Sequence, residues 1–227
     1  MRERTSLRKP AVLSESTQRR LGMYALAASA AGVGTLGLTP SAEAKIVYTP
    51  AHVKILYPGV PLDFNHDQIV DFYVWIGASL PSSTLLSVCQ YVVRNGNGFY
   101  DCSSSRGTNR VRRTLSGGQA WAAALKHGAS IDRKGQFLKS RAHMAFVSDF
   151  DHTHTSRWFG PWANGGKGVK DRYLGLKFKI RRHFHFGWAR LNVQADTGGY
   201  LHATLTGYAY ETIPGKESSQ VKPKARA

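Results

Sequence analysis

The sequence predicts an all-β fold, an antiparallel β-sandwich of jelly-roll type that carries one short helix and one long irregular loop. Three observations favour this class. Apolar and polar residues alternate with a period of two over several short runs, as they do in half-buried strands. Glycine, proline and Asn-Gly pairs separate these runs. Late in the chain, three runs follow one another across short turns, which is typical of an antiparallel meander.

Residues 1–44 predict a cleavable secretion signal rather than a part of the fold. Basic residues mark the first twenty positions, an apolar run rich in alanine and glycine covers 21–38, and Ala42-Glu43-Ala44 has the small-x-small pattern that a signal peptidase accepts. The run is short for a spanning helix, which needs roughly 20 apolar residues. We therefore expect an exported protein, secreted, periplasmic or at the cell surface, with no transmembrane segment after cleavage. The alternative is an N-terminal anchor that is never cut.

The rest of the chain predicts a single β-sandwich domain over 45–215 and a disordered basic tail over 216–227, which has little to bury. Pro50 is expected to divide the first strand in two. The pair Arg181-Arg182 is expected to form a tight turn between two strands of the meander. Strands are expected over 46–48, 53–57, 70–76, 85–93, 174–180, 184–193 and 200–210.

The short helix is expected over Gln119–His127, an alanine-rich run that begins after Ser116-Gly117-Gly118 and ends at Gly128. Residues 138–168 are dense in histidine, tryptophan, glycine and proline. We expect either a long irregular loop or a set of very short strands there.

The two cysteines, Cys89 and Cys102, enclose a turn rich in glycine and asparagine. In an oxidising compartment an even number of cysteines indicates a bridge. We predict a disulfide bond between them, because their spacing fits neither a redox pair nor a zinc knuckle.

The segment that begins at Asp63 predicts a structural calcium site. Oxygen-bearing side chains fall at positions 1, 3, 5 and 9, the ligand spacing of calcium loops, and position 7 offers a backbone carbonyl. The candidate ligands are Asp63, Asn65, Asp67, Ile69 and Asp71. Gln68 stands where such loops place a glycine, and Val74 stands where they place a glutamate. The alternative is a hydrogen-bonded turn that leads into a strand.

Two histidine pairs, His152 with His154 and His183 with His185, have the H-x-H spacing. On a strand this spacing projects both rings from one face, which suits zinc. The alternative is a set of surface histidines with no role.

Trp158 and Trp162 predict a carbohydrate-binding surface in the irregular segment, because flat rings stack on sugars. The alternative is that both build the core, as most aromatic residues of a β-domain do.

The formal net charge of +17 predicts anionic partners, because an excess of cations concentrates anions near the surface. The basic residues are spread along the chain. We therefore expect an anionic surface or a polysaccharide, and no specific nucleic acid. The alternative is a solvated basic surface without a dedicated site. Arg190 is expected to pair with Glu211 on a neighbouring strand.

The sequence contains no G-x-S-x-G elbow, H-E-x-x-H helix, phosphate loop or Rossmann glycine pattern. We therefore expect no enzyme, no catalytic residues and no cofactor other than calcium. The function predicted is that of a secreted or periplasmic structural or binding module whose ligand is unknown. The alternatives are a carbohydrate-binding protein and an extracellular hydrolase.

Two stretches carry a familiar order of residues. The first contains Lys45–Ala51, Leu62–Asp67 and Asp71-Phe72, and the second contains Tyr173–Phe178, His185–Leu191 and Gly207–Gly215. The two stretches resemble the start and the end of a family of uncharacterised exported bacterial proteins, and the order of the second is similar to the "FGFRF…HYGWA…AYE-PG" segments of PEP-CTERM-type extracellular proteins. The resemblance implies an exported β domain and no particular activity. The chain departs from the pattern at Gln68, which replaces the loop glycine, and no sorting motif follows Pro214.

Overall fold

The structure, a computed structural model of the chain, describes residues 45–80, 83–94, 97–101, 108–139, 141–148, 156–196 and 200–219. All of them belong to one compact unit, Ala44–Ala227. The secretion signal predicted over 1–44 lies outside the described residues. Within the described ranges, no helix has the length and apolar character needed to cross a membrane.

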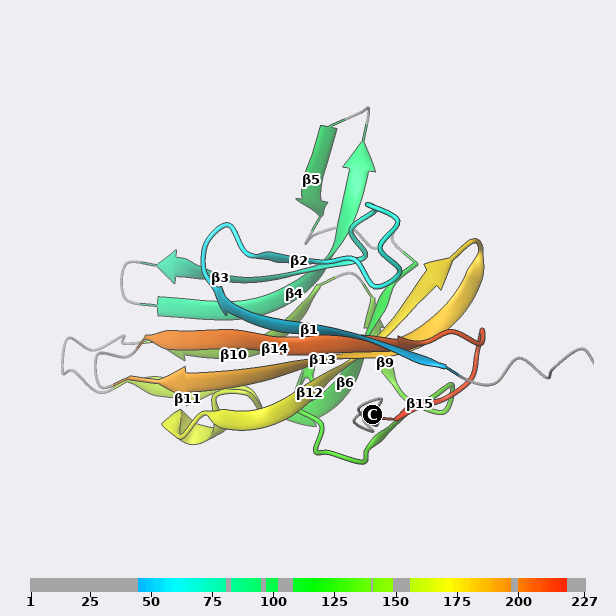
Figure 1. Ribbon diagram of the computed structural model, residues 1–227. Coiled ribbons are helices and arrows are strands. Elements are labelled where there is room, and N and C mark those ends of the chain that lie inside the picture. The colour runs from blue at the N-terminus through cyan, green and yellow to red at the C-terminus, as the bar shows by residue number, and fades with distance from the viewer. Residues whose placement is uncertain are drawn as a thin grey trace, which may run out of the picture. The chain divides into compact units, whose positions relative to one another are not determined.

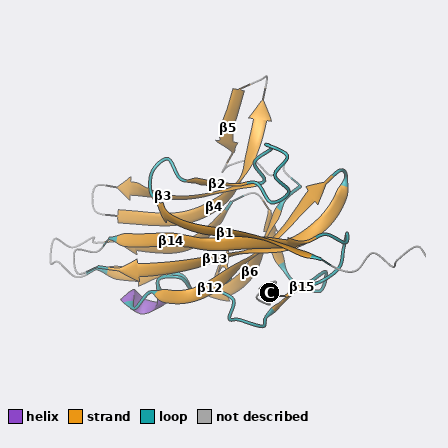
Figure 2. Cartoon of the chain, in the orientation of Figure 1, coloured by secondary structure: helices purple, strands orange, loops and turns teal. Residues whose placement is uncertain are grey.

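Strands dominate this part of the chain, and its one helical element is the 3-10 turn η1 (Asn164–Gly166), as Figure 2 shows. Every strand pair in the described ranges is antiparallel. The predicted all-β class is confirmed.

The larger sheet contains the meander that the sequence predicts, and Figure 1 shows its three long strands side by side. Its spatial order is β1 (Ile46–Ile55), β14 (Leu201–Glu211), β13 (His183–Ala195), β12 (Val169–Ile180), β6 (Arg110–Ser116) and β7 (Gln119–Ala122), and β9 (Phe137–Lys139) also pairs with β6.

The second sheet has the spatial order β11 (Arg157–Phe159), β10 (Ala142–Ser148), β4 (Ser83–Arg94), β3 (Phe72–Leu80) and β2 (Val60–Leu62), and β5 (Asn97–Asp101) also pairs with β4. A small third sheet pairs β15 (Ser218–Ser219) with β8 (Ser130–Ile131).

A two-residue turn joins β12 to β13. Arg181 and Arg182 have φ angles of 46° and 73°, and a type I′ turn requires this left-handed conformation at both positions. The turn sets the register in which Ile180 lies opposite His183. The tight turn predicted at the two arginines is confirmed.

Pro50 does not divide the first strand, so the prediction of two separate strands is wrong. β1 is continuous, and its register against β14 shifts between Pro50 and Val53. Proline lacks an N–H donor, but β1 is an edge strand of its sheet, where such an irregularity is tolerated.

The helix predicted over Gln119–His127 is also wrong. Gly117 and Gly118 have φ angles of 59° and 75° and close a tight hairpin, so Gln119 begins β7 instead of a helix. Leu125 then makes an isolated antiparallel bridge to Tyr173. Strand pairing and burial outweigh the modest helix preference of alanine.

The segment 138–168 forms short strands in its described part, so the second of the two alternatives holds there. The predicted tail also needs correction, because Ser218 is fully buried and pairs with Ile131. The domain therefore extends beyond residue 215 and includes 216–219. Residues 220–227 lie outside the described residues.

The two larger sheets enclose the main apolar core. Leu174 and Phe178 enter it from β12, Leu86 enters from β4 and Met144 enters from β10, and all four are fully buried. Phe64 stacks on Phe178 with ring centroids 4.5 Å apart. A core shared by two antiparallel sheets confirms the predicted sandwich-like arrangement.

The larger sheet also buries side chains on its outer face, which points away from the second sheet. Tyr173, Phe186 and Trp188 form a second buried cluster with Ile131, and Phe137 packs against it. The β12–β13 hairpin is therefore covered on both faces.

Replacing Phe178 by alanine tests the importance of the shared core. We expect Phe178→Ala to lower the free energy of unfolding by about 3–5 kcal/mol, because it leaves a cavity between the sheets. Phe159→Ala is the matched control, since Phe159 is 43% exposed, and it should cost well under half as much. Urea denaturation followed by tryptophan fluorescence measures both values, and equal losses would contradict this description of the core.

Candidate functional site

The loop that contains the candidate calcium ligands is closed by its own hydrogen bonds. The Asp63 carboxylate accepts the N–H groups of Asp67 at 3.3 Å and Gln68 at 2.8 Å. The Asp67 carboxylate accepts the Ile69 N–H at 2.9 Å and the Asn65 amide at 2.7 Å. This is the hydrogen-bonded turn that the sequence left open as the alternative.

Gln68 adopts a φ of 69°, so it occupies the left-handed conformation for which calcium loops use glycine. No group of three or more His, Cys, Asp or Glu side chains within the described ranges is arranged to hold a metal ion. Calcium binding by the Asp63–Asp71 loop stays a prediction.

Asp71 lies buried beneath this loop, with 7% of its surface exposed. Its Oδ2 accepts the Phe64 N–H at 3.0 Å, and the Asn109 side-chain amide donates to its backbone carbonyl at 3.0 Å. Burial raises the pKa of Asp71 to about 7; the Phe64 hydrogen bond lowers it, and the negative charges of Asp63 and Asp67 raise it. The loop therefore rests on a carboxyl group that changes its charge near neutral pH.

A polar cleft of about 470 Å³ opens beside the loop. We call it the polar cleft, and its lining includes Asn65, His66, Asp67, Arg181, His183, His185, Tyr210, Thr212 and Pro214. The loop supplies one wall, and the β12–β13 turn and the end of β14 supply the others. Hydrogen-bonding groups from distant parts of the sequence thus converge on one space.

His185 has a fixed orientation in this cleft. Its Nδ1 lies 2.9 Å from the backbone oxygen of Glu211. A carbonyl oxygen can only accept, so Nδ1 carries the hydrogen, and Nε2 of the neutral ring is left as an acceptor. The ring is 5% exposed and lies near Phe178 and Tyr210, at centroid distances of 6.4 and 6.0 Å.

A second cleft of about 420 Å³ lies on the outer face of the same hairpin. We call it the basic cleft, and it is lined by Arg133, Lys177, Arg182, His183, Phe184, Phe186, Pro214 and Gly215. His183 and Pro214 line both clefts. The end of the β12–β13 hairpin therefore separates a polar space from a cationic one.

Lys177 is the best-defined cation of the basic cleft. Its Nζ lies 4.3 Å from the ring centroid of Phe184. Burial lowers the pKa of Lys177, and the positive charges of Arg110 and Arg133 lower it further. Within the described part of the chain, none of Arg133, Lys177 and Arg182 forms an ion pair with a carboxylate.

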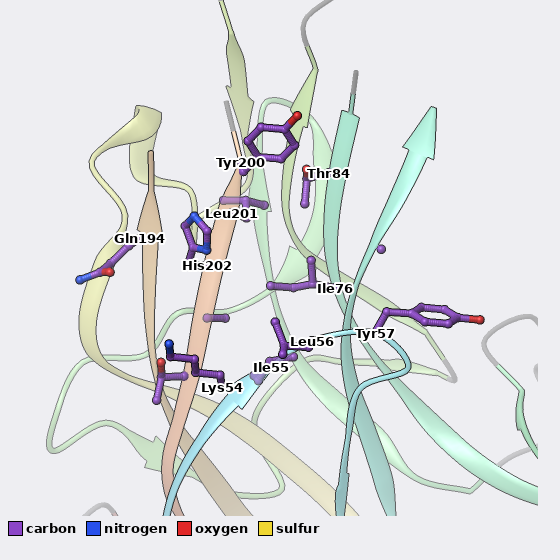
Figure 3. Close-up of a pocket in the computed structure, with 13 residues that line it drawn as sticks. Lys54, Ile55, Leu56, Tyr57, Ile76, Thr84, Gln194, Tyr200, Leu201 and His202 are labelled. Carbon is purple, nitrogen blue, oxygen red and sulfur yellow. The ribbon is translucent and has the colours of Figure 1, made fainter. Parts of the chain in front are cut away.

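A third cavity of about 620 Å³ lies at the other end of β13 and β14. Ile55, Ile76 and Leu201 give it an apolar lining, and Figure 3 shows these residues together with Lys54 and His202. A specific small-molecule site usually adds a few convergent polar groups to its apolar lining. The two clefts that meet at His183 fit that description better.

The fold places the two tryptophans of the predicted sugar-binding surface in different environments. Trp162 is fully buried, and its Nε1 donates to the Ala122 oxygen at 3.0 Å. A ring without exposed surface cannot stack on a sugar, so the prediction for Trp162 is wrong and the core alternative holds for it. Trp158 is half-buried and lines a cleft with Gln119 and Asn164. Sugar binding at Trp158 stays a prediction.

Other predicted residues lie partly outside the described ranges. Cys89 is fully buried on β4, but Cys102 lies outside, as do His152 and His154. The disulfide and the first histidine pair therefore stay predictions. The second pair, His183 and His185, does share one face of β13, because both rings line the polar cleft.

The predicted pair between Arg190 and Glu211 does not form. Arg190 lies opposite Gly207 in the β13–β14 register and donates to the Thr206 hydroxyl at 2.8 Å. Glu211 is 2% exposed, and its Oε1 accepts the Ile213 N–H at 3.0 Å. The strand register separates the two side chains.

The sequence prediction missed the basic cleft. Arg133 lies far from Lys177 and Arg182 along the chain, so spacing alone does not reveal the cluster. The Arg181-Arg182 turn was the available signal, because type I′ turns strongly prefer Asn-Gly. Two arginines stand where the turn conformation favours asparagine and glycine, and that mismatch is visible in the sequence.

No family model matches the chain, and no curated protein or solved structure is significantly similar to it. The resemblance to exported bacterial proteins therefore stays a prediction. Its two stretches do meet in space, because the first supplies Asn65 and Asp67 to the polar cleft and the second supplies His185 and Tyr210.

Replacing Asp71 by asparagine tests its pKa of about 7. The pKa of Asp71 is near 3.8 in the unfolded chain and about 7 in the folded one, so the folded state binds the proton more tightly. The free energy of unfolding therefore falls progressively as the pH rises from about 4 to 7. Asparagine cannot ionise. We therefore expect Asp71→Asn to gain stability relative to the original chain between pH 5 and pH 8, measured by urea denaturation with chelator present.

Asp132→Asn is the control for this measurement, because the Asp132 carboxylate also accepts a backbone N–H, from Lys134 at 2.9 Å, but at a more exposed position. Its effect on stability should vary much less with pH. A constant difference between Asp71→Asn and the original chain at both pH values would contradict the raised pKa of Asp71.

Proposed function

We propose that this chain is an exported binding module that holds an anionic ligand in its basic cleft at the bacterial cell surface. The observation that carries the proposal is the grouping of Arg133, Lys177 and Arg182 around one cleft, where none of them forms an ion pair with a described carboxylate. Grouped cations in a partly desolvated space raise the local concentration of anions.

The electrostatics of this cleft favour an anion over water. Burial and two neighbouring cations disfavour the charged form of Lys177, and a bound carboxylate or sulfate would offset both effects. The Arg112 guanidinium adds a further positive charge near this cleft, and its Nη1 is buried without a hydrogen-bond partner among the described residues. Its guanidinium lies 5.8 Å from the ring centroid of Phe137.

The turn arginines support the same proposal. A left-handed conformation costs a non-glycine residue about 1–2 kcal/mol, and here two successive arginines adopt it. Arg181 lines the polar cleft and Arg182 lines the basic cleft. Folding alone favours Asn-Gly at such a turn, so we attribute the two charges to ligand binding.

Export is part of the proposal, and so is the disulfide. The last described pair of the β4–β5 ladder is Gln90 with Asp101. Cys89 precedes the first of these residues and Cys102 follows the second, so the register supports a bridge between the two strands. A calcium ion in the Asp63–Asp71 loop would add a structural brace beside the polar cleft.

Neutral carbohydrate binding is the second candidate. The observation that favours it is the cleft of about 570 Å³ where Trp158 lies with Gln119 and Asn164, because an aromatic face beside side-chain amides suits a sugar. A neutral dextran that bound as tightly as a charged polymer would favour this candidate. Release of reducing sugar would favour the hydrolase alternative.

Replacing Lys177 by methionine tests the anion site directly. The change keeps an unbranched apolar stem and removes the charge, so we expect binding to dextran sulfate to weaken about 5- to 10-fold at low salt, while the melting temperature stays constant or rises. Isothermal titration calorimetry gives the affinity, and neutral dextran should not bind detectably.

Lys170→Met is the matched control, because Lys170 lies at the far end of the same strand and is exposed. It should leave the affinity unchanged. If both lysine variants weakened dextran sulfate binding equally, the polymer would be bound by net charge alone, and the proposed site would be wrong.

Replacing the turn by Asn-Gly separates stability from binding. We expect the double variant Arg181→Asn, Arg182→Gly to raise the free energy of unfolding by about 1–2 kcal/mol, because it removes two left-handed arginines. The same variant should bind dextran sulfate more weakly. The control Arg181→Lys, Arg182→Lys keeps both charges and should retain most of the affinity for dextran sulfate. If this control bound as weakly as the Asn-Gly variant, charge at the turn would have no role in binding.

A further inference from the structure

We infer that the third cavity binds the hydrocarbon chain of a fatty acid, with the carboxylate of the ligand beside Lys54. The site is separate from the basic cleft, so it adds a second kind of ligand to the proposed anion-binding module. Three features of the cavity carry the inference: its apolar lining, the exposed apolar side chains around it, and the charge at Lys54.

The cavity lies where β1 leaves the larger sheet. The last residue pair between β1 and β14 joins Ile55 to Ala203, and the next strand along the chain, β2, belongs to the second sheet. β14 begins two residues earlier, at Leu201, which pairs with β13 alone among the described strands. The place beside this end of β14 is therefore open, and residues of β1, β3, β4 and β14 line the space (Figure 3).

The inner lining of the cavity is part of the main apolar core. Ile55, Leu201 and Ala203 line it and are buried members of the core cluster, and Ile76 packs against that cluster. A ligand that enters among these side chains leaves water, which favours hydrocarbon. The volume of about 620 Å³ lies within the range of sites that enclose a small molecule. Facing sheets lie only about 10 Å apart, which suits a thin, flexible chain.

Exposed apolar side chains gather around this cavity. Seven large apolar residues of the described ranges are exposed, and three of them, Leu56, Tyr57 and Tyr200, line it. Single exposed apolar residues are ordinary in soluble proteins. A group of them beside an apolar cavity indicates a binding surface, and these three side chains therefore mark the entrance for an apolar ligand.

The charges of the lining select the head group of the ligand. Lys54 and His202 line the cavity, and none of the lining residues in the described part of the chain is Asp, Glu or Arg. The Nε2 atom of His202 lies 2.8 Å from the Asp196 carboxylate, so its ring is directed to that group. Lys54 forms no ion pair with a described carboxylate. Its ammonium group is therefore the partner for a carboxylate at the end of the bound chain.

A series of saturated carboxylates tests the apolar part of the site. Isothermal titration calorimetry of the full chain with octanoate, nonanoate and decanoate should give a dissociation constant that tightens about three- to fourfold for each added methylene group, the gain expected for its full burial. An affinity that does not depend on chain length overturns the inference.

Replacing Leu56 by asparagine tests the position of the chain. We expect Leu56→Asn to weaken decanoate binding about 5-fold, because it removes an apolar group at the entrance. Leu115→Asn is the matched control, since Leu115 is exposed to the same degree, at 63% against 65%, and lies on β6 away from the cavity. The control should keep the original affinity. Both positions are exposed, so circular dichroism should find both variants folded. Equal losses in the two variants overturn the site.

Replacing Lys54 by methionine tests the head group. We expect Lys54→Met to weaken decanoate binding about 2- to 5-fold, as for an exposed ion pair, and to leave the binding of decanol unchanged. Lys126→Met, at an exposed position outside the cavity, should change neither affinity. An unchanged decanoate affinity in Lys54→Met overturns the placement of the carboxylate.

The same titrations separate this inference from the proposed function. Lys177→Met should leave decanoate binding unchanged, and Leu56→Asn should leave dextran sulfate binding unchanged. If Lys177→Met weakened decanoate binding and Leu56→Asn did not, the carboxylate would lie in the basic cleft. That result overturns the fatty acid site and leaves the proposed function intact.

A second copy of the chain is the other occupant that these variants detect. Analytical ultracentrifugation of the original chain should show no self-association that depends on Leu56. If the chain formed a dimer that Leu56→Asn dissociated and Leu115→Asn did not, and if decanoate left that dimer intact, the apolar surface would be an interface between copies. The inference of a fatty acid site would then be wrong.

Discussion

The β12–β13 hairpin packs apolar side chains on both of its faces, and the rest of the structure is built around that packing. Phe178 faces the second sheet, and Phe186 and Trp188 face outwards into a separate buried cluster. Gly187 makes the inner side of this packing possible, because a Cβ there would come within 3.1 Å of both Phe64 and Phe178. A hairpin fixed on both faces holds its terminal turn in one position, and that turn places Arg181 in the polar cleft and Arg182 in the basic cleft.

The proposed function depends on basic residues at positions where the fold disfavours them. The turn conformation favours Asn-Gly, yet Arg181 and Arg182 occupy it. Lys177 lies over the Phe184 ring, and burial lowers its pKa, as do the nearby positive charges of Arg110 and Arg133. Residues that cost stability without a folding benefit are expected where a ligand binds. The apolar residues of the hairpin offset this cost, which explains how one element can serve both folding and the proposed anion binding.

Period-two alternation predicted the strands of the meander well, because each long strand buries one set of alternating residues in the main core. The alanine content of Gln119–His127 wrongly predicted a helix, because a Gly-Gly turn and strand pairing decide the conformation there. The loop around Asp63 was found from its oxygen spacing, but spacing cannot show that Asp71 is buried. The basic cleft escaped prediction for a related reason: Arg133 joins Lys177 through tertiary packing, which no local pattern reports.

Amide hydrogen exchange with and without dextran sulfate tests the central claim most directly, because it reports which backbone segments the ligand covers. We predict added protection at the β12–β13 turn around Arg182 and in the segment around Gly215, with little change near Trp158. Protection confined to the Trp158 region, or spread evenly over the basic surface, would contradict an anion site at the end of the hairpin.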